Sequence, residues 1–408
     1  MAGTPRGYRT LFADRRFAFY FGTQTAGDAG YAVYAIAVVW LALEVSGSLF
    51  VASVVLALEY GIYSLSFTAG PFVDRARNPR TILFIGYPAQ GALALVLGTL
   101  ALTGHLGVPT LLVLVAALSV LWNFTYWATL AILPRIVGQG QLFRAHGLTT
   151  AISGVNQIIG YVAGAALILL VGPAGGMFLY AALNFVAALL AIGLVVPRST
   201  RPQEPLAKEF WEGWRYFFSR PDRSLVELSV FSAMEAFFAM ASVLLIALLA
   251  RTEFADPAGS YGLLFTSLAV GGIAGGLLLG HLNPRHRVGI LLVGVTAAEG
   301  LAIILATSAA PSLVLSALAW FALGFIQVGF FTTVLVYVQA TTPGPILGRT
   351  MSNVYLFRGS SLAVGALVVG ALGLVLPPVS IALVVGAFLL TAAALAAVAL
   401  PTARRLSF

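Results

Sequence analysis

The sequence predicts an all-α polytopic membrane protein, on the basis of its composition, its number of apolar stretches and the placement of its charges. Of 408 residues, 60% are hydrophobic and only 9% are charged, and the mean hydropathy is +0.98. This composition excludes an ordinary soluble domain. A helix that crosses the hydrocarbon core needs about 20 apolar residues, and the chain divides into twelve such stretches.

The predicted transmembrane helices fall into two sets of six. The first set covers residues 17–43, 49–72, 81–102, 108–133, 148–170 and 176–196. The second set covers residues 225–249, 261–282, 288–307, 312–337, 349–374 and 378–400. We therefore expect an N-terminal six-helix bundle over residues 1–197, a cytoplasmic linker over 198–223 and a C-terminal six-helix bundle over 224–408.

The linker between the two sets carries aromatic and basic side chains from Glu209 to Phe218. This pattern predicts an amphipathic helix in the membrane interface, and a solvated linker with a few anchoring aromatic residues is the alternative. A faint repeat crosses the linker, because Asp28 and Glu235 are 207 residues apart and Gly70 and Gly276 are 206 apart.

Two stripes of small residues predict close helix packing. Glycines recur every fourth residue at Gly272, Gly276 and Gly280, and again at Gly160 and Gly164. Such spacing places the small residues on one helix face, where a neighbouring backbone can approach closely.

Basic residues predict the orientation of the spans. Of the 22 Lys and Arg residues, Arg251 is assigned to one face and Arg358 to the interior of a span, and all the others fall on the opposite face. By the positive-inside rule, both termini are cytoplasmic. The net charge of +8 is therefore a topology signal, and we expect no nucleic-acid partner.

The sequence lacks the residues and motifs on which several kinds of catalytic or metal-binding site depend. Cysteine is absent, and the four histidines show no paired ligand spacing. Neither a nucleophile elbow nor a nucleotide-binding glycine string is present. We therefore expect no cofactor, no metal site and no enzymatic activity, and any active transport would draw on an ion gradient or on the substrate's own gradient.

The turn after the second predicted span contains an ordered series of glycine, aspartate and arginines. It reads Gly70-Pro71-Phe72-Val73-Asp74-Arg75-Ala76-Arg77-Asn78-Pro79-Arg80. This string resembles the loop 2–3 signature of the major facilitator superfamily. The resemblance implies two pseudo-symmetric six-helix halves that work by alternating access.

The same resemblance implies a cytoplasmic gate. Its expected residues are Gly70, Asp74, Arg75 and Arg80, together with Gly348 and Arg349 at the start of span eleven. When the cytoplasmic side closes, we expect Asp74 to lie near residues 348–351, because the positive end of the helix dipole would stabilise its carboxylate.

Further segments resemble the enterobactin-exporter and macrolide-efflux branch of that superfamily. They are Gly27-Asp28, Trp40-Leu41, Ser46-Gly47-Ser48, Leu133-Pro134, residues 142–148, residues 212–216, Gln339, Pro343, Gly348-Arg349 and Met351-Ser352. The branch implies efflux from the inner, plasma membrane of a prokaryote. Two departures stand out: His146 occupies a position that is usually Asn, and Gly160-Tyr161 lacks the proline of the antiporter motif in span five.

Five ionisable residues fall inside predicted spans: Asp28, Glu59, Glu235, Glu299 and Arg358. A charge near the bilayer centre is costly, so it normally faces a cavity or a partner. The resemblance implies that spans one, four, seven and ten line the central cavity. Asp28 and Glu235 are therefore the first candidates for proton coupling. Glu299 and Glu59 are further candidates, with a structural pair or a lipid-facing position as the alternative.

Arg358 supports two interpretations. It can neutralise one of the four buried acids, any of which is a possible partner. Alternatively, it can recognise an anionic substrate or a lipid headgroup.

Polar and aromatic side chains mark a candidate substrate cavity. Gln24, Asp28 and Tyr31 share one face of span one, because they follow the helical spacing i, i+4, i+7. The other candidates, in spans four, ten and eleven, are Trp122, Asn123, Tyr126, Gln327, Phe331 and Arg358. Rings beside hydrogen-bonding groups suit a bulky, partly apolar ligand, although aromatic residues in spans often serve packing alone.

These patterns predict a secondary active transporter that exports a hydrophobic or amphiphilic small molecule, such as a drug or a siderophore-like compound, against proton entry. A buried carboxyl group suits this exchange, since it can hold either a proton or a cationic partner. We expect small-molecule substrate, protons and membrane lipids as partners, and a monomer as the working unit. The alternatives are a lipid or lysophospholipid flippase of the same fold and a non-transporting membrane receptor or scaffold.

Overall fold

The structure, a computed structural model, describes residues 9–65, 72–73, 76, 78–137, 139–197, 206–219, 223–282, 288–342 and 344–399. Within these ranges all regular secondary structure is helical and no strand occurs. The predicted all-α class is therefore confirmed.

By packing, the chain divides into two compact units. The first comprises residues 1–41 and 68–203, and the second comprises residues 42–67 and 204–408. In the first unit the helices are α1 (Arg9–Phe12), α2 (Arg15–Ser46), α5 (Arg80–Leu102), α6 (Val108–Ile136), α7 (Gln139–Val171) and α8 (Pro173–Ile192), although the last residues of α2 belong to the second unit.

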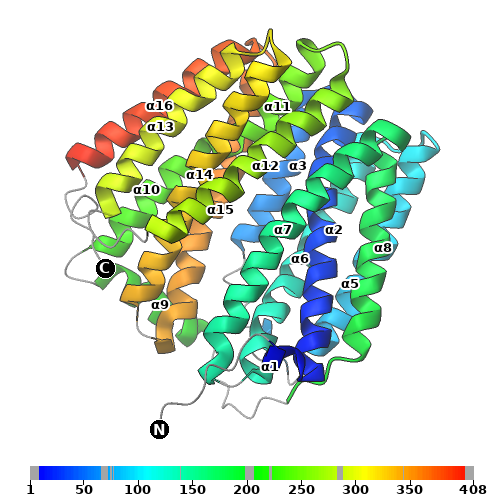
Figure 1. The fold of residues 1–408 in the computed structure, drawn as a ribbon, viewed down its shortest axis with the longest axis vertical. Helices are drawn as coiled ribbons and strands as arrows, with labels where there is room; N and C mark the ends of the chain where they lie inside the picture. The colour runs from blue at the N-terminus through cyan, green and yellow to red at the C-terminus, as the bar shows by residue number, and fades with distance from the viewer. Residues whose placement is uncertain are drawn as a thin grey trace. The chain divides into compact units, whose positions relative to one another are not determined.

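The second unit contains the remaining helices. They are α3 (Leu49–Ser64), α9 (Leu206–Ser219), α10 (Ser224–Ala239), α11 (Ala241–Thr252), α12 (Pro257–Leu282), α13 (Val288–Ser308), α14 (Leu313–Thr341), α15 (Gly344–Leu372) and α16 (Pro378–Ala399). Within each unit the long helices run alongside one another (Figure 1).

Among the described helices, eleven are long and apolar enough to cross a membrane, and α3 is a shorter apolar helix. The second predicted span extends from α3 through residues 66–71, which lie outside the described part of the chain. Broken into α10 and α11 at Met240, the seventh span still counts as one crossing of residues 224–252. The predicted polytopic architecture is therefore present.

The helix α3 packs with the C-terminal helices, which is why the packing units differ from the predicted bundle of residues 1–197. Its Ser53 and Ser64 lie against Gly370 and Gly359 of α15. Because glycine has no side chain, the two backbones approach closely at both points.

In the first unit, the predicted glycine face of span five is confirmed. A Cβ atom on Gly160 would clash with Ala32 of α2, and one on Gly164 would lie 3.3 Å from the carbonyl oxygen of Val33. The α7 backbone therefore lies directly on α2, beside the middle of span one.

In the second unit, the glycine face of α12 differs from the predicted stripe by one residue. Cβ atoms on Gly271 and Gly275 would collide with the carbonyl groups of Phe321 and Phe325 in α14. By contrast, a Cβ on Gly276 would make only an ordinary contact, at 3.8 Å from a methyl group of Val328. The predicted stripe of Gly272, Gly276 and Gly280 therefore flanks the closest approach, as far as its described members show.

The break in span seven lies beside another close approach. A Cβ atom on Gly365 of α15 would collide with the carbonyl group of Phe237, three residues before Met240. The α10 and α15 backbones are therefore in direct contact just before the break, and this contact brings the polar groups of the two helices together.

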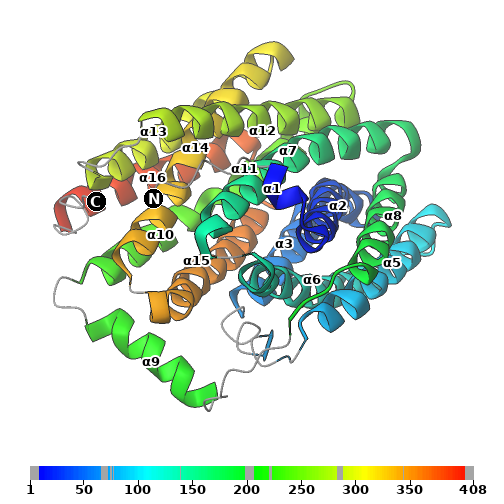
Figure 2. The same ribbon diagram turned by 60° about the horizontal axis from the view of Figure 1, so that its bottom comes forward.

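The linker forms the helix α9, which confirms the predicted helix; its position in the membrane interface stays a prediction. Figure 2 shows α9 as a separate short helix at one end of the long helices of its unit. Phe217 is fully buried and stacks on Phe357 of α15 at 5.8 Å between ring centroids. On its other side, Trp211 and Phe218 are exposed.

We predict that Gly275→Ala destabilises the protein and that Gly276→Ala does not. Both substitutions gain the same helix propensity over glycine, so their difference isolates the contact with Phe325. Forcing a methyl group into that contact is expected to cost about 1–3 kcal/mol. Thermal unfolding of both variants in detergent measures the difference, and equal melting temperatures would contradict the close packing of α12 on α14.

Candidate functional site

The polar centre of the first unit is built around Asp28, in the middle of α2. Its Oδ2 atom accepts a hydrogen bond from the hydroxyl of Ser153 in α7 and another from the amide of Gln24 at 3.4 Å. The Gln24 amide also lies 3.5 Å from the Ser153 hydroxyl. Two neutral donors therefore hold this carboxylate.

The close approach of α7 to α2 positions this cluster. Asn156 of α7 donates a hydrogen bond to the Thr25 carbonyl at 3.2 Å, and Gly160, about one turn further along α7, lies on Ala32. Asn156 therefore acts as a link between helices, whereas Gln157 lines the neighbouring cavity and donates to the Tyr161 hydroxyl at 2.9 Å.

A cavity of about 480 Å³ opens beside Asp28, within the first unit. It is lined by Tyr20, Gln24, Gly27, Asp28, Tyr31, Ala32, Tyr87, Gln90, Trp122, Thr125, Tyr126, Thr129, Leu130, Thr149, Ser153, Gly154, Gln157, Tyr161 and Asn184. The predicted cavity residues Gln24, Tyr31, Trp122 and Tyr126 are thus brought together with Asp28. The predicted cavity residue Asn123 is not among the lining residues; it is one of the buried residues of α6 and is 4% exposed.

Three aromatic rings form a continuous stack on the wall of the cavity. Tyr31 stacks on Trp122 with centroids 4.6 Å apart, and Trp122 stacks on Tyr126 with centroids 5.1 Å apart. Offset stacking of this kind fixes the rings relative to one another. The wall is therefore a rigid aromatic surface that joins α2 to α6.

A second layer of hydrogen bonds supports the same wall. The hydroxyl of Tyr180 donates to Gln90 Oε1 at 2.8 Å, and Gln90 Nε2 donates to the hydroxyl of Thr125 at 3.2 Å. Both Gln90 and Thr125 line the cavity. Buried polar groups that are paired in this way resist rearrangement.

The list of cavity residues predicted from the sequence includes none from α7, although this helix contributes to the cavity. Ser153, Gln157 and Tyr161 recur every fourth residue and therefore share one helix face. The same periodicity that identified Gln24, Asp28 and Tyr31 could have found them.

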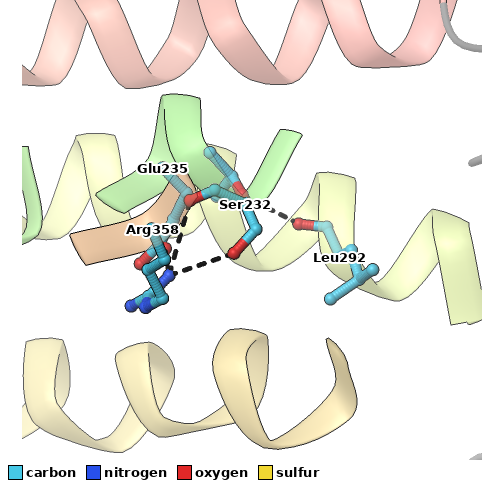
Figure 3. A network of polar contacts seen from close by, with 5 residues as sticks. Ser232, Glu235, Leu292 and Arg358 are labelled. Carbon is cyan, nitrogen blue, oxygen red and sulfur yellow. Dashed lines mark hydrogen bonds and ion pairs between the residues drawn. The ribbon is translucent and has the colours of Figure 1, made fainter. Parts of the chain in front are cut away.

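The polar centre of the second unit is an ion pair between Arg358 of α15 and Glu235 of α10 (Figure 3). The Glu235 side chain is 1% exposed and that of Arg358 is 13% exposed. The same Arg358 nitrogen donates to the Ser232 hydroxyl at 3.3 Å. Figure 3 also draws Leu292, whose carbonyl accepts a hydrogen bond from Thr296 at 3.0 Å.

An aromatic ring completes the surroundings of the guanidinium. Its central carbon lies 4.2 Å from the ring centroid of Phe331 in α14, a cation–π contact. Of the predicted cavity residues in this unit, Phe331 and Arg358 are therefore in contact with each other, and Gln327 is half-buried on the same helix as Phe331. The guanidinium is held on one side by a carboxylate and on another by a ring.

A second buried acid lies near this pair. Glu299 of α13 is 3% exposed, and it interacts electrostatically with both Glu235 and Arg358. Among the residues that the structure describes, its Oε1 atom has no hydrogen-bond partner. The fourth acid, Glu59 of α3, is buried and is not the ion-pair partner of Arg358.

Of the predicted gate residues, Arg80 is described together with its side-chain contacts. Its guanidinium donates to the carbonyl of Ala191 at 3.0 Å and to that of Ile192. Helix C-termini leave such carbonyls without a partner, so Arg80 caps α8.

The other gate residues are less completely described. Gly70, Asp74 and Arg75 lie outside the described residues, and for Gly348 and Arg349 only the backbone, in α15, is described. The expected approach of Asp74 to span eleven stays a prediction.

The two polar centres occupy equivalent places in the sequence repeat. Asp28 and Glu235 both lie in the first long helix of a set of six, and their partners, Ser153 and Arg358, both lie in the fifth. The separation between the two partners matches that between the two acids to within two residues. One acid is therefore neutralised by a cation, and the equivalent acid is not.

Comparison with known proteins gives a family match over nearly the whole chain. The model of the transmembrane secretion effector family, of major facilitator type, matches residues 10–406. Two curated relatives are both named enterobactin exporter EntS. The protein from Citrobacter koseri is 27% identical over 325 residues, which cover 78% of this chain and 75% of the relative. The protein from Shigella boydii serotype 18 is 26% identical over 318 residues, covering 76% and 74%.

Solved structures share the fold at low identity. A POT family transporter in complex with 5-aminolevulinic acid has a TM-score of 0.78 at 11% identity, covering 99% of this chain and 98% of that one. The nucleoside transporter NupG has a TM-score of 0.69 at 11% identity, covering 94% and 99%. Together with the helices described above, these matches confirm the predicted major facilitator fold.

We predict that Arg358→Ala destabilises the protein strongly, because it leaves Glu235 as an unpaired buried charge. Removing one partner of a buried ion pair costs about 3–5 kcal/mol. The double variant Arg358→Ala with Glu235→Gln is expected to recover much of that loss, since the amide carries no charge. Melting temperatures in detergent measure both effects.

The matched control combines Arg358→Ala with Glu59→Gln. Because Glu59 is not the ion-pair partner, this double variant is expected to melt as early as the single one. Equal recovery in both doubles would show that Arg358 balances the total charge of the unit and has no specific partner in Glu235.

Proposed function

Because the chain belongs to the transmembrane secretion effector family of major facilitator transporters, we propose that it exports a hydrophobic or amphiphilic small molecule in exchange for protons. The transport cycle would follow alternating access, the mechanism associated with two pseudo-symmetric helical halves. The names of the relatives, enterobactin exporters, support export as the direction.

The observation that carries the proposal is the position of Asp28. Its carboxylate lies in the middle of a membrane-spanning helix and on the wall of the cavity. The groups that bind it, Ser153 and Gln24, are neutral. A carboxylate held by neutral donors keeps its full charge, and a proton or a ligand from the cavity can cancel that charge.

This arrangement permits exchange at a single group. When Asp28 is ionised, it attracts a ligand that carries positive charge or donates hydrogen bonds. When it takes up a proton, that attraction is lost and the ligand is released. Proton entry and ligand exit are therefore alternatives at the same carboxyl group, which is the requirement for coupled antiport.

The second acidic centre supports assigning the exchange to Asp28. Glu235 is bound to Arg358 and is nearly inaccessible, so protonating it would break a buried ion pair. The same ion pair engages Arg358, on which a lipid-phosphate site would depend, and it therefore argues against the flippase alternative.

The proposed location is the inner membrane of a bacterium, with both termini in the cytoplasm. The bacterial relatives support the membrane, and the distribution of Lys and Arg supports the orientation.

We predict that Asp28→Asn abolishes proton-driven transport and preserves downhill transport. The amide keeps the size of the side chain but exchanges no proton, so an imposed pH gradient has no group to act on. Proteoliposomes with a trapped pH indicator and an amphiphilic dye, rhodamine 6G, measure dye and proton movement together. The parent is expected to accumulate dye against its gradient and to dissipate the pH gradient. The variant should do neither, but it should still move dye down an imposed dye gradient.

Glu44→Gln provides the matched control, because Glu44 lies on the same helix, α2, and is exposed. This variant is expected to transport like the parent. If Asp28→Asn still accumulated dye when a pH gradient was applied, the coupling role would move to Glu235 or Glu299.

A further inference from the structure

In the described part of the chain, the formal charge that lines the cavity of the first unit is negative only. Among the described residues that line it, Asp28 is the only formally charged side chain, and no Lys, Arg or His takes part. The remaining lining is made of tyrosines, a tryptophan, amides, hydroxyls and small residues. An anionic ligand would therefore meet a negative charge with no nearby cation in this lining to offset it.

The carboxylate is oriented to take a ligand. Both of its hydrogen bonds reach Oδ2, from Ser153 and from Gln24. Among the residues that the structure describes, none donates a hydrogen bond to Oδ1, and this atom is not among the fully covered polar atoms without a partner. The Oδ1 lone pairs are therefore available to a ligand in the cavity that Asp28 lines.

The aromatic wall adds a second element of recognition. The stack of Tyr31, Trp122 and Tyr126 lies in the same cavity, and Tyr31 is on the same helix face as Asp28, three residues away. Aromatic faces carry negative potential and attract cations. They also accept flat rings in offset stacking.

We propose that this cavity binds organic cations, with the positively charged nitrogen against Asp28 Oδ1 and a flat aromatic body against the stacked rings. The proposal names the substrate class of the transport site described above, so it rests on the proposed function. The substrate class proposed here is inferred from the residues that line the cavity, and not from the names of the relatives.

Three probes of one shape test the charge preference. They are 10-methylacridinium, which is permanently cationic, acridine, buffered so that it is neutral, and acridine-9-carboxylate, which is anionic. Binding to the purified full-length protein in detergent is measured by quenching of tryptophan fluorescence, for which Trp122 lies in the cavity. We expect the cation to bind at least about tenfold more tightly than acridine, a difference of about 1.4 kcal/mol, and the anion to bind most weakly.

Variants then assign the preference to residues. Asp28→Asn is expected to abolish the difference in affinity between the cation and acridine. Tyr126→Leu removes one ring of the stack and should weaken cation and acridine alike. Glu44→Gln, on the exposed face of α2, should match the parent for all three probes.

Two results would overturn the proposal. One is equal binding of the three probes to the parent, or tightest binding of the anion, and this measurement needs no variant to fold. The other is a cation preference that survives in Asp28→Asn.

Failure of this inference is distinguishable from failure of the proposed function, because binding is measured without any gradient. A cation preference without proton-driven transport would overturn the coupling alone. Asp28-dependent, proton-driven transport with no preference for cations would overturn the substrate class alone.

Discussion

The constraint on which the rest of the structure depends is the burial of a carboxylate in the first long helix of each set of six. A charged group inside a membrane protein is tolerated only with a partner or a cavity. Glu235 meets this requirement through Arg358, and Asp28 through Ser153, Gln24 and an adjoining cavity. Helix packing makes both arrangements possible. Glycines allow the α7 backbone to lie on α2 and the α15 backbone to lie on α10.

The two solutions have different consequences. An ion pair is self-contained, because each charge is the counter-ion of the other, and breaking it strands a charge in a medium of low polarity. Hydrogen bonds from neutral donors stabilise a carboxylate without cancelling its charge. The second unit therefore holds a fixed structural element near Phe331 and Glu299, whereas the first unit keeps a charge that another species can neutralise.

Most of the fold could be predicted from the sequence, because spans depend on local hydropathy, whereas the orientation inferred from loop charges stays a prediction. Helical spacing also placed Gln24, Asp28 and Tyr31 on one face correctly. The partner of Arg358 could not be predicted, since it depends on which helix lies beside α15, and four acids were equivalent in the sequence. The glycine face of α12 was misplaced by one residue because Gly271-Gly272 and Gly275-Gly276 form adjacent stripes, and only the position of α14 distinguishes them.

The relation between family and substrate follows from the same geometry. A family match over residues 10–406 establishes the transporter family, and the structure shows the helices and their packing. Identity of 26–27% to the enterobactin exporters leaves most side chains free to differ, and ligand charge is read by a few of them. In this chain the cavity lining contributes Asp28 and no basic residue, while Arg358 is occupied by Glu235. On the proposal above, the charge of this chain's substrate therefore depends on Asp28, the buried acid without a counter-ion in the described residues, and a family match does not fix that feature.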